Sequence, residues 1–168
     1  NSITIGIVRD EGVYRIPKKH KIEIHKMYKK TTDTLLKDLR SGRIKGWDKS
    51  TIQGRMMNKK NSLVYDIIYE TYMEPKYLTP CRAGSLFGII EANGIVRPCE
   101  ILEKPLGQLR DYNLDFTKLW YDTKAEQTRD WIKNTKCNCH YDCAWSFNIL
   151  ANKEFQPSLI AAALGKDV

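Results

Sequence analysis

Three of the five cysteines in this chain fall within seven residues, at Cys137, Cys139 and Cys143. In a reducing compartment such a cluster is typical of a metal or iron–sulfur site rather than of disulfides. The cysteine count is odd, and we find no apolar signal-peptide segment. A chain of 168 residues also buries enough surface to fold without disulfides. We therefore expect a cytoplasmic protein whose cysteines bind a metal centre.

The net charge of +8 resides in the first half of the sequence. Residues 1–80 carry 17 Lys and Arg against 9 Asp and Glu, whereas residues 81–168 carry 11 of each. Aromatic residues do not alternate with these basic residues, and no nucleic-acid motif is present. We expect a solvated face or a surface that contacts another part of a larger protein, and nucleic acid is not an expected partner. No apolar run approaches the roughly 18 residues of a membrane span, so we expect no membrane partner.

The N-terminal half predicts one strand followed by two helices. Ser2 to Val8 is rich in β-branched residues and predicts a strand buried on both faces of a parallel sheet. Nothing else in the chain supplies that sheet, which suggests the C-terminal part of a longer protein. An exposed basic connector leads to a helix from Ile22 to Leu39. His20 and His25, in this basic stretch, are both predicted to be solvated. Residues 43–60 read as a basic loop, and a second helix spans Ser62 to Met73.

A β-hairpin is predicted around Asn93-Gly94, the dipeptide most typical of a two-residue type I′ turn. This turn pairs Ile90 with Arg97 and Gly88 with Cys99. Because glycine has no side chain, we expect space beside the Cys99 thiol for a bulky group such as a cluster.

The C-terminal part predicts short helices around the cysteines. A helical turn covers residues 116–121, and Thr123 and Glu126 form a capping box that opens a helix to about Asn134, with Trp131 and Ile132 inward. Two further helices follow at about 144–151 and 157–164. The fold class is therefore α+β, with a small β-hairpin and flanking helices around a cysteine-ligated cluster, preceded by the strand and linker helices.

Cys81, twelve residues, Gly94, four residues and Cys99, together with Cys139-x(3)-Cys143, resemble the SPASM or twitch C-terminal extensions of radical SAM enzymes. The sequences at 105–109 and 119–120 are also similar to that family. The resemblance implies three segments: the end of the catalytic barrel at 1–42, a linker and helix at 43–80, and an auxiliary cluster domain at 81–168.

The resemblance also implies a cofactor and a role. Cys143 would join Cys81 and Cys99 as cluster ligands, with either Cys137 or Cys139 as the fourth, and four thiolates are the usual ligands of a [4Fe–4S] cluster. Five cysteines, against seven in the full pattern, imply one cluster. The Cys-x(3)-Cys-x(2)-Cys motif is absent, so S-adenosylmethionine would bind only in the full-length enzyme, and this segment alone is not expected to be catalytic.

The implied function is to position the substrate or to transfer electrons in a radical SAM oxidoreductase or maturase. The implied partners are the rest of the barrel in cis, a peptide or small-molecule substrate, and an electron-transfer protein.

Zinc is the alternative metal, bound by four cysteines or by three cysteines and His140. Zinc sites usually have closely paired cysteines at both ends, whereas Cys81 and Cys99 are 18 positions apart, so we favour iron–sulfur. The alternative function is a structural zinc-binding interaction module whose basic half binds an acidic partner.

Overall fold

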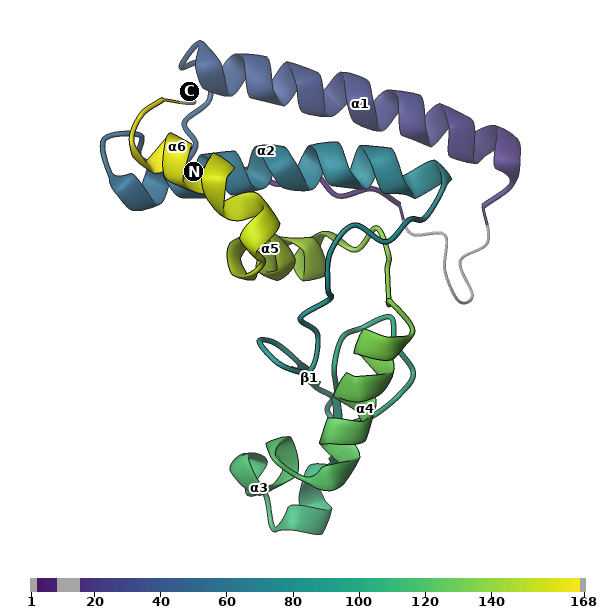
Figure 1. The fold of residues 1–168 in the computed structure, drawn as a ribbon. Helices are drawn as coiled ribbons and strands as arrows, with labels where there is room; N and C mark the ends of the chain where they lie inside the picture. The colour runs from purple at the N-terminus through teal and green to yellow at the C-terminus, as the bar shows by residue number, and fades with distance from the viewer. Residues whose placement is uncertain (1–2, 9–15, 167–168) are drawn as a thin grey trace. The chain divides into compact units, whose positions relative to one another are not determined.

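A computed structural model describes residues 3–8 and 16–166 of the chain (Figure 1). The described residues form six α-helices and a three-stranded antiparallel sheet, which confirms the predicted α+β class. The chain divides into two compact units. The helical unit comprises residues 1–76 and 139–168, and the hairpin unit comprises residues 77–138. None of the helices in the described ranges is long and apolar enough to cross a membrane.

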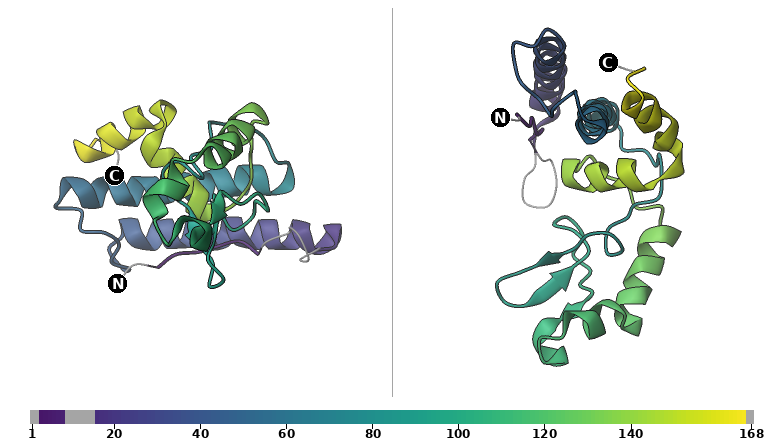
Figure 2. Two further views of the ribbon diagram at one scale, coloured as in Figure 1. Left: turned by 90° about the horizontal axis from the view of Figure 1, so that it is seen from below. Right: turned by 90° about the vertical axis from the view of Figure 1, so that its left-hand side faces the viewer.

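The helical unit is built around α2 (Ile52–Met73). Helix α1 (Lys18–Arg40) lies alongside α2, and α5 (Asp142–Ala151) and α6 (Gln156–Ala163) also pack against α2 (Figures 1 and 2). Ile68 and Tyr72 of α2 have no exposed surface, since helices surround the stripe on which they lie.

Both long helices begin earlier than the sequence predicted. Helix α1 starts at Lys18, within the predicted connector. Helix α2 starts at Ile52, where the Thr51 hydroxyl oxygen caps it by accepting the Gly54 N–H at 2.9 Å. The sequence predicted a loop over residues 43–60, but Gly54 is buried within α2, and a Cβ there would lie 1.8 Å from the Asp48 carbonyl oxygen. This glycine allows close packing inside a helix.

The predicted N-terminal strand is wrong over its described part. Residues 3–8 form no strand, and Ile3 and Val8 are 49% and 59% exposed. A strand needs a neighbour to accept and donate its backbone hydrogen bonds, and the sheet in the described residues pairs only β1, β2 and β3. Ser2, the first residue of the predicted strand, and residues 9–15, which follow the strand, lie outside the described ranges.

The hairpin unit has a small sheet, β1 (Ile89–Ile90), β2 (Ile95–Arg97) and β3 (Gly107–Gln108), in that order. The 3₁₀-helix η1 (Leu109–Tyr112), α3 (Phe116–Trp120) and α4 (Thr123–Asn134) follow. Val96, Leu106, Leu119 and Ala125 form its fully buried core. Helix α4 has the predicted extent, but its cap is Asp122, whose side chain accepts the Lys124 N–H, rather than the predicted capping box.

The hairpin register differs by one residue from the prediction, because Ile89 pairs with Arg97 and Ile90 with Val96. The turn is a three-residue loop in which Glu91 exchanges hydrogen bonds with Gly94 and Ile95. Gly94 has a φ of +87°, whereas Asn93 is not among the described residues with positive φ, and a type I′ turn requires positive φ at both positions.

This register overturns the predicted pairing of Gly88 with Cys99. A Cβ at Gly88 would lie 3.0 Å from the Arg97 carbonyl oxygen and 3.2 Å from the Trp120 ring. The indole of Trp120 therefore packs against Gly88, which does not lie opposite Cys99.

Candidate functional site

Three of the five predicted ligands meet in the hairpin unit. Cys99 is 9% exposed and forms a buried cluster with Ala83 and Ile132. Cys81 and Cys137, both half-buried, pack against this cluster. We call these five residues the cysteine pocket. Its members come from the segment before β1, the segment after β2, and α4 with the residues just beyond it.

The sulfur of Cys99 accepts a backbone hydrogen bond. The Leu102 N–H donates to Cys99 Sγ at 3.4 Å. A neutral thiol is a weak acceptor, whereas a thiolate gains more from such a bond. Hydrogen bonds to ligating sulfurs are also one of the means by which proteins adjust iron–sulfur clusters. The backbone therefore supplies one hydrogen-bond donor to the Cys99 sulfur.

Cys137 is held by the C-terminus of α4. Lys136 has a φ of +50°, its N–H donates to the Lys133 carbonyl oxygen at 3.2 Å, and the Cys137 N–H donates to the Ile132 carbonyl oxygen at 3.1 Å. These two bonds form a Schellman motif, in which the residue after the left-handed position usually contacts the last turn of the helix. Cys137 packs against the cluster that contains Ile132 in this way.

Arg129 of α4 supports the cysteine pocket and was not singled out by the sequence. Its Nε donates to the Gly84 carbonyl oxygen at 2.6 Å, and its guanidinium donates to the Trp120 carbonyl oxygen and lies 5.1 Å from the Trp120 ring centroid. Arg129 therefore fastens α4 to the segment between Cys81 and β1. Its main partners are backbone carbonyls, which leave no pattern in a sequence.

Trp131 and Ile132 of α4 were both predicted to point inward, and this is correct for one of them. Ile132 is 2% exposed, but Trp131 is 36% exposed and lies under the Lys104 ammonium, at 4.9 Å. Adjacent helical residues point in directions about 100° apart, so only one of them faces the cysteine pocket.

Cys139 and Cys143 belong to the helical unit. The Cys139 carbonyl oxygen accepts the Trp145 indole N–H at 2.8 Å. Cys143 is exposed in the first turn of α5, and its N–H donates to Asp142 Oδ1 at 2.9 Å. The structure thus packs Cys81, Cys99 and Cys137 into one pocket and places the other two cysteines in the other unit.

Cys143 also lines a cavity of about 160 Å³ in the helical unit, together with Lys60, Asp142 and Ser146. Lys60 is 8% exposed, and its ammonium donates to the Ser146 hydroxyl at 3.4 Å. Burial lowers the pKa of Lys60, and the nearby Asp142 and Cys143 partly offset this effect. Cys143 therefore lies in an environment that contains a buried cation.

The histidines belong mainly to the packing of the helical unit. His140 is 6% exposed, and its ring packs edge-on against Tyr72 with 5.1 Å between ring centroids. His25 was predicted to be solvated, but this is wrong, since its ring stacks on Tyr69 at 4.0 Å and its Nε2 donates to the Tyr69 carbonyl oxygen at 2.7 Å. His20 is exposed, as predicted.

The donor set of the cysteine pocket fits a soft metal centre. Thiolates select zinc or iron–sulfur clusters, whereas magnesium and calcium prefer oxygen ligands. None of the five cysteines forms a disulfide. Within residues 3–8 and 16–166, no three His, Cys, Asp or Glu side chains are already arranged to hold a metal ion.

Comparison with models of known protein families, with curated proteins and with solved structures found no match to this chain.

Proposed function

We propose that this chain binds one [4Fe–4S] cluster and serves as the auxiliary-cluster region of a radical SAM enzyme. The observation that carries this proposal is the packing of Cys81 and Cys137 against the buried cluster that contains Cys99. Packing alone does not require three thiols from separate segments, since an apolar side chain of similar size would fill the space of each. The cysteine pocket favours Cys137 over Cys139 as a ligand, and the sequence resemblance adds Cys143 as the fourth.

When bound, such a cluster would accept and donate single electrons. The residues of the chain prepare its surroundings. The Leu102 N–H would stabilise the Cys99 thiolate, and the Schellman motif would fix the approach of Cys137. Phe87, Ile101 and Leu102 pack around the same pocket and would limit the access of water, which affects the potential of a cluster.

The proposed role is substrate positioning or electron transfer in a radical SAM oxidoreductase or maturase. S-adenosylmethionine would bind only in the full-length enzyme. The rest of the barrel in cis, a peptide or small-molecule substrate and an electron-transfer protein are the proposed partners, and the proposed location is the cytoplasm.

A structural zinc-binding module is the second candidate, because the same thiolates suit zinc. Its basic half, which carries 17 Lys and Arg against 9 Asp and Glu, would bind an acidic partner. His140, the further zinc ligand of this candidate, packs edge-on against Tyr72 in the structure.

Anaerobic purification followed by iron, sulfide and zinc analysis separates the two candidates. We expect a brown protein with broad visible absorbance and about four irons per chain. Colourless protein that binds one zinc per chain, and takes up no iron or sulfide on anaerobic reconstitution, would replace the first candidate with the second.

A further inference from the structure

The cavity of about 160 Å³ in the helical unit holds one cation and one anion. Among the described residues that line it, Lys60 of α2 and Asp142 of α5 carry a formal charge. Ile5, Val64 and Tyr65 form an apolar wall beside them. A cavity with opposite charges next to an apolar wall can receive a ligand that carries both charges.

Lys60 brings a buried ammonium to this cavity. The ammonium donates to the Ser146 hydroxyl at 3.4 Å. Lysine is almost never fully buried unless it is paired, and an ammonium has three N–H donors. Burial lowers the pKa of Lys60, and the Asp142 carboxylate opposes this shift. A carboxylate bound in the cavity would give the ammonium a charged acceptor in addition to the neutral hydroxyl.

Asp142 brings a carboxylate to the same cavity from the first turn of α5. Its Oδ1 accepts the Cys143 N–H at 2.9 Å, and its Oδ2 would lie 3.8 Å from a Cβ at Gly6. A carboxylate has about four acceptor positions on its two oxygens, so Asp142 can accept further hydrogen bonds. The described residues show no direct ion pair between Asp142 and the Lys60 ammonium. A ligand with both charges would bridge the two.

The walls of the cavity are held in place. The Tyr65 hydroxyl has a hydrogen bond with the Ile5 backbone, which attaches residues 3–8 to α2. Val64 and Tyr65 are both buried. Thr4 and Cys143, which also line the cavity, are exposed, so a solute can enter between them.

The size of the cavity indicates a small ligand. Sites for drug-sized molecules have volumes of roughly 300–1,000 Å³, well above this one. A single buried water needs only about 10–15 Å³, so the cavity has room for more than one water molecule. A molecule of a few heavy atoms fits between these limits.

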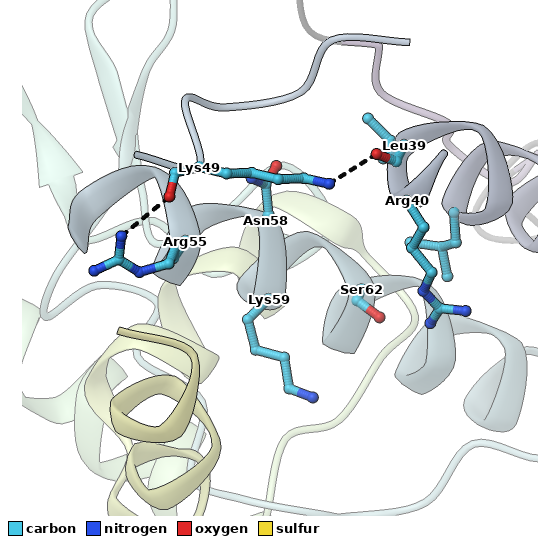
Figure 3. Close-up of a pocket in the computed structure, with 8 residues that line it drawn as sticks. Leu39, Arg40, Lys49, Arg55, Asn58, Lys59 and Ser62 are labelled. Atoms are coloured by element: carbon cyan, nitrogen blue, oxygen red, sulfur yellow. Dashed lines mark hydrogen bonds between the residues drawn. The ribbon is translucent and has the colours of Figure 1, made fainter. Parts of the chain in front are cut away.

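Another cavity of the helical unit, of about 100 Å³, lies at the end of α1 and the start of α2 (Figure 3). Its Lys49 and Arg55 side chains donate to backbone carbonyl oxygens, those of Leu39 at 2.9 Å and of Lys49 at 3.0 Å. No Asp or Glu of the described residues lines it. This cavity therefore lacks the opposite charges, and its exposed Arg40 provides a control.

We propose that the cavity beside Lys60 and Asp142 binds a small α-amino acid as a zwitterion. The ligand carboxylate contacts the Lys60 ammonium, and the ligand ammonium contacts the Asp142 carboxylate. The Ser146 hydroxyl, whose oxygen accepts from Lys60, donates its own proton to the ligand carboxylate. The apolar wall suits a short side chain such as that of alanine. The inference does not depend on the cluster proposed above, since neither charged residue is a proposed cluster ligand.

Isothermal titration of the whole chain with L-alanine tests this proposal. Propionate lacks the ammonium of alanine, and ethylammonium lacks its carboxylate, so these two analogues measure the need for each charge. The test variants are Lys60→Met and Asp142→Asn, which remove the charge and keep a side chain of similar size. The control is Arg40→Met, which removes a cation from the cavity in Figure 3. Thermal unfolding shows that each variant is folded.

We expect saturable binding of L-alanine to the wild-type chain, and binding at least about tenfold weaker for each analogue and for each test variant. Arg40→Met should change the affinity by at most about twofold. Wild-type protein that does not bind L-alanine, or binds propionate equally well, would overturn the proposal. So would equal losses in Lys60→Met and Arg40→Met. If Asp142→Asn does not fold, the comparison of propionate with alanine on the wild-type chain tests the same contact.

Discussion

The backbone N–H of Cys137 donates a hydrogen bond to the carbonyl oxygen of Ile132, at 3.1 Å. This bond joins a predicted cluster ligand to the helix residue that is buried with Cys99. It depends on Lys136, which adopts a left-handed backbone conformation to complete the Schellman motif. The position of Cys137 is therefore determined by the end of α4.

The first prediction concerns Lys136. Its φ of +50° is unfavourable for a residue with a Cβ, whereas glycine adopts it readily. We expect Lys136→Gly to raise the free energy of unfolding by about 1 kcal/mol in urea titrations. The control is Lys133→Gly within α4, which should lower it by about 1 kcal/mol. A loss of stability with Lys136→Gly would show that the motif is not formed in solution.

The second prediction concerns Arg129. Replacing it with Met removes its bonds to Gly84 and Trp120 and leaves two carbonyls without their donor. Because hydrogen bonds to charged groups contribute about 1.5–3 kcal/mol, Arg129→Met should destabilise the chain by at least 2 kcal/mol and reduce iron retention. Arg129→Lys keeps the charge but loses the planar fork and should recover only part of the stability. Urea unfolding that is unchanged in Arg129→Met would refute this role.

A third prediction compares two buried tyrosines of the helical unit. Among the described residues, the Tyr28 hydroxyl has no hydrogen-bond partner, and burial raises the pKa of Tyr28. Tyr65 is also buried, but its hydroxyl has a hydrogen bond with the Ile5 backbone. Tyr28→Phe should stabilise the chain by about 1 kcal/mol, and Tyr65→Phe should destabilise it by about 1 kcal/mol. Thermal unfolding of the two variants measures the difference, and effects of the same sign would contradict this reading.

The helices near the cysteines were predictable because their signals are local. The extent of α4 followed from polar residues at its start and an apolar face that includes Ile132, and α5 and α6 followed from the same kind of periodicity. Their exact contacts did not follow. The sequence could not show that Asp122 rather than Thr123 caps α4, since both residue types are good caps.

The hairpin shows where local reasoning fails. Asn93-Gly94 located the turn correctly, but the register depends on whether one or two residues adopt positive φ. Only Gly94 does so within the turn, and in the resulting register Gly88 packs against Trp120 and does not pair with Cys99. Gly54 is a similar case. A glycine is needed inside α2 because the Asp48 carbonyl oxygen approaches it closely, and no local sequence pattern reveals that approach.

A fourth prediction separates the two neighbouring cysteines. Cys137 packs in the cysteine pocket, whereas the carbonyl oxygen of Cys139 accepts the Trp145 indole N–H. We expect Cys137→Ala to lose tight iron binding and Cys139→Ala to retain about four irons per chain, the number in a [4Fe–4S] cluster. Anaerobic iron and sulfide analysis of the two purified variants gives the answer. The reverse result would assign the ligand to Cys139 and leave Cys137 as packing.

The most direct test of the central claim is anaerobic iron and sulfide analysis of Cys99→Ala beside the wild-type chain. Cys99 is the buried member of the cysteine pocket, and its sulfur accepts the Leu102 N–H. We predict about four irons and four sulfides in the wild type and neither in Cys99→Ala, together with a lower Tm, because metal binding contributes to folding. A full complement of iron and sulfide in Cys99→Ala would contradict the claim.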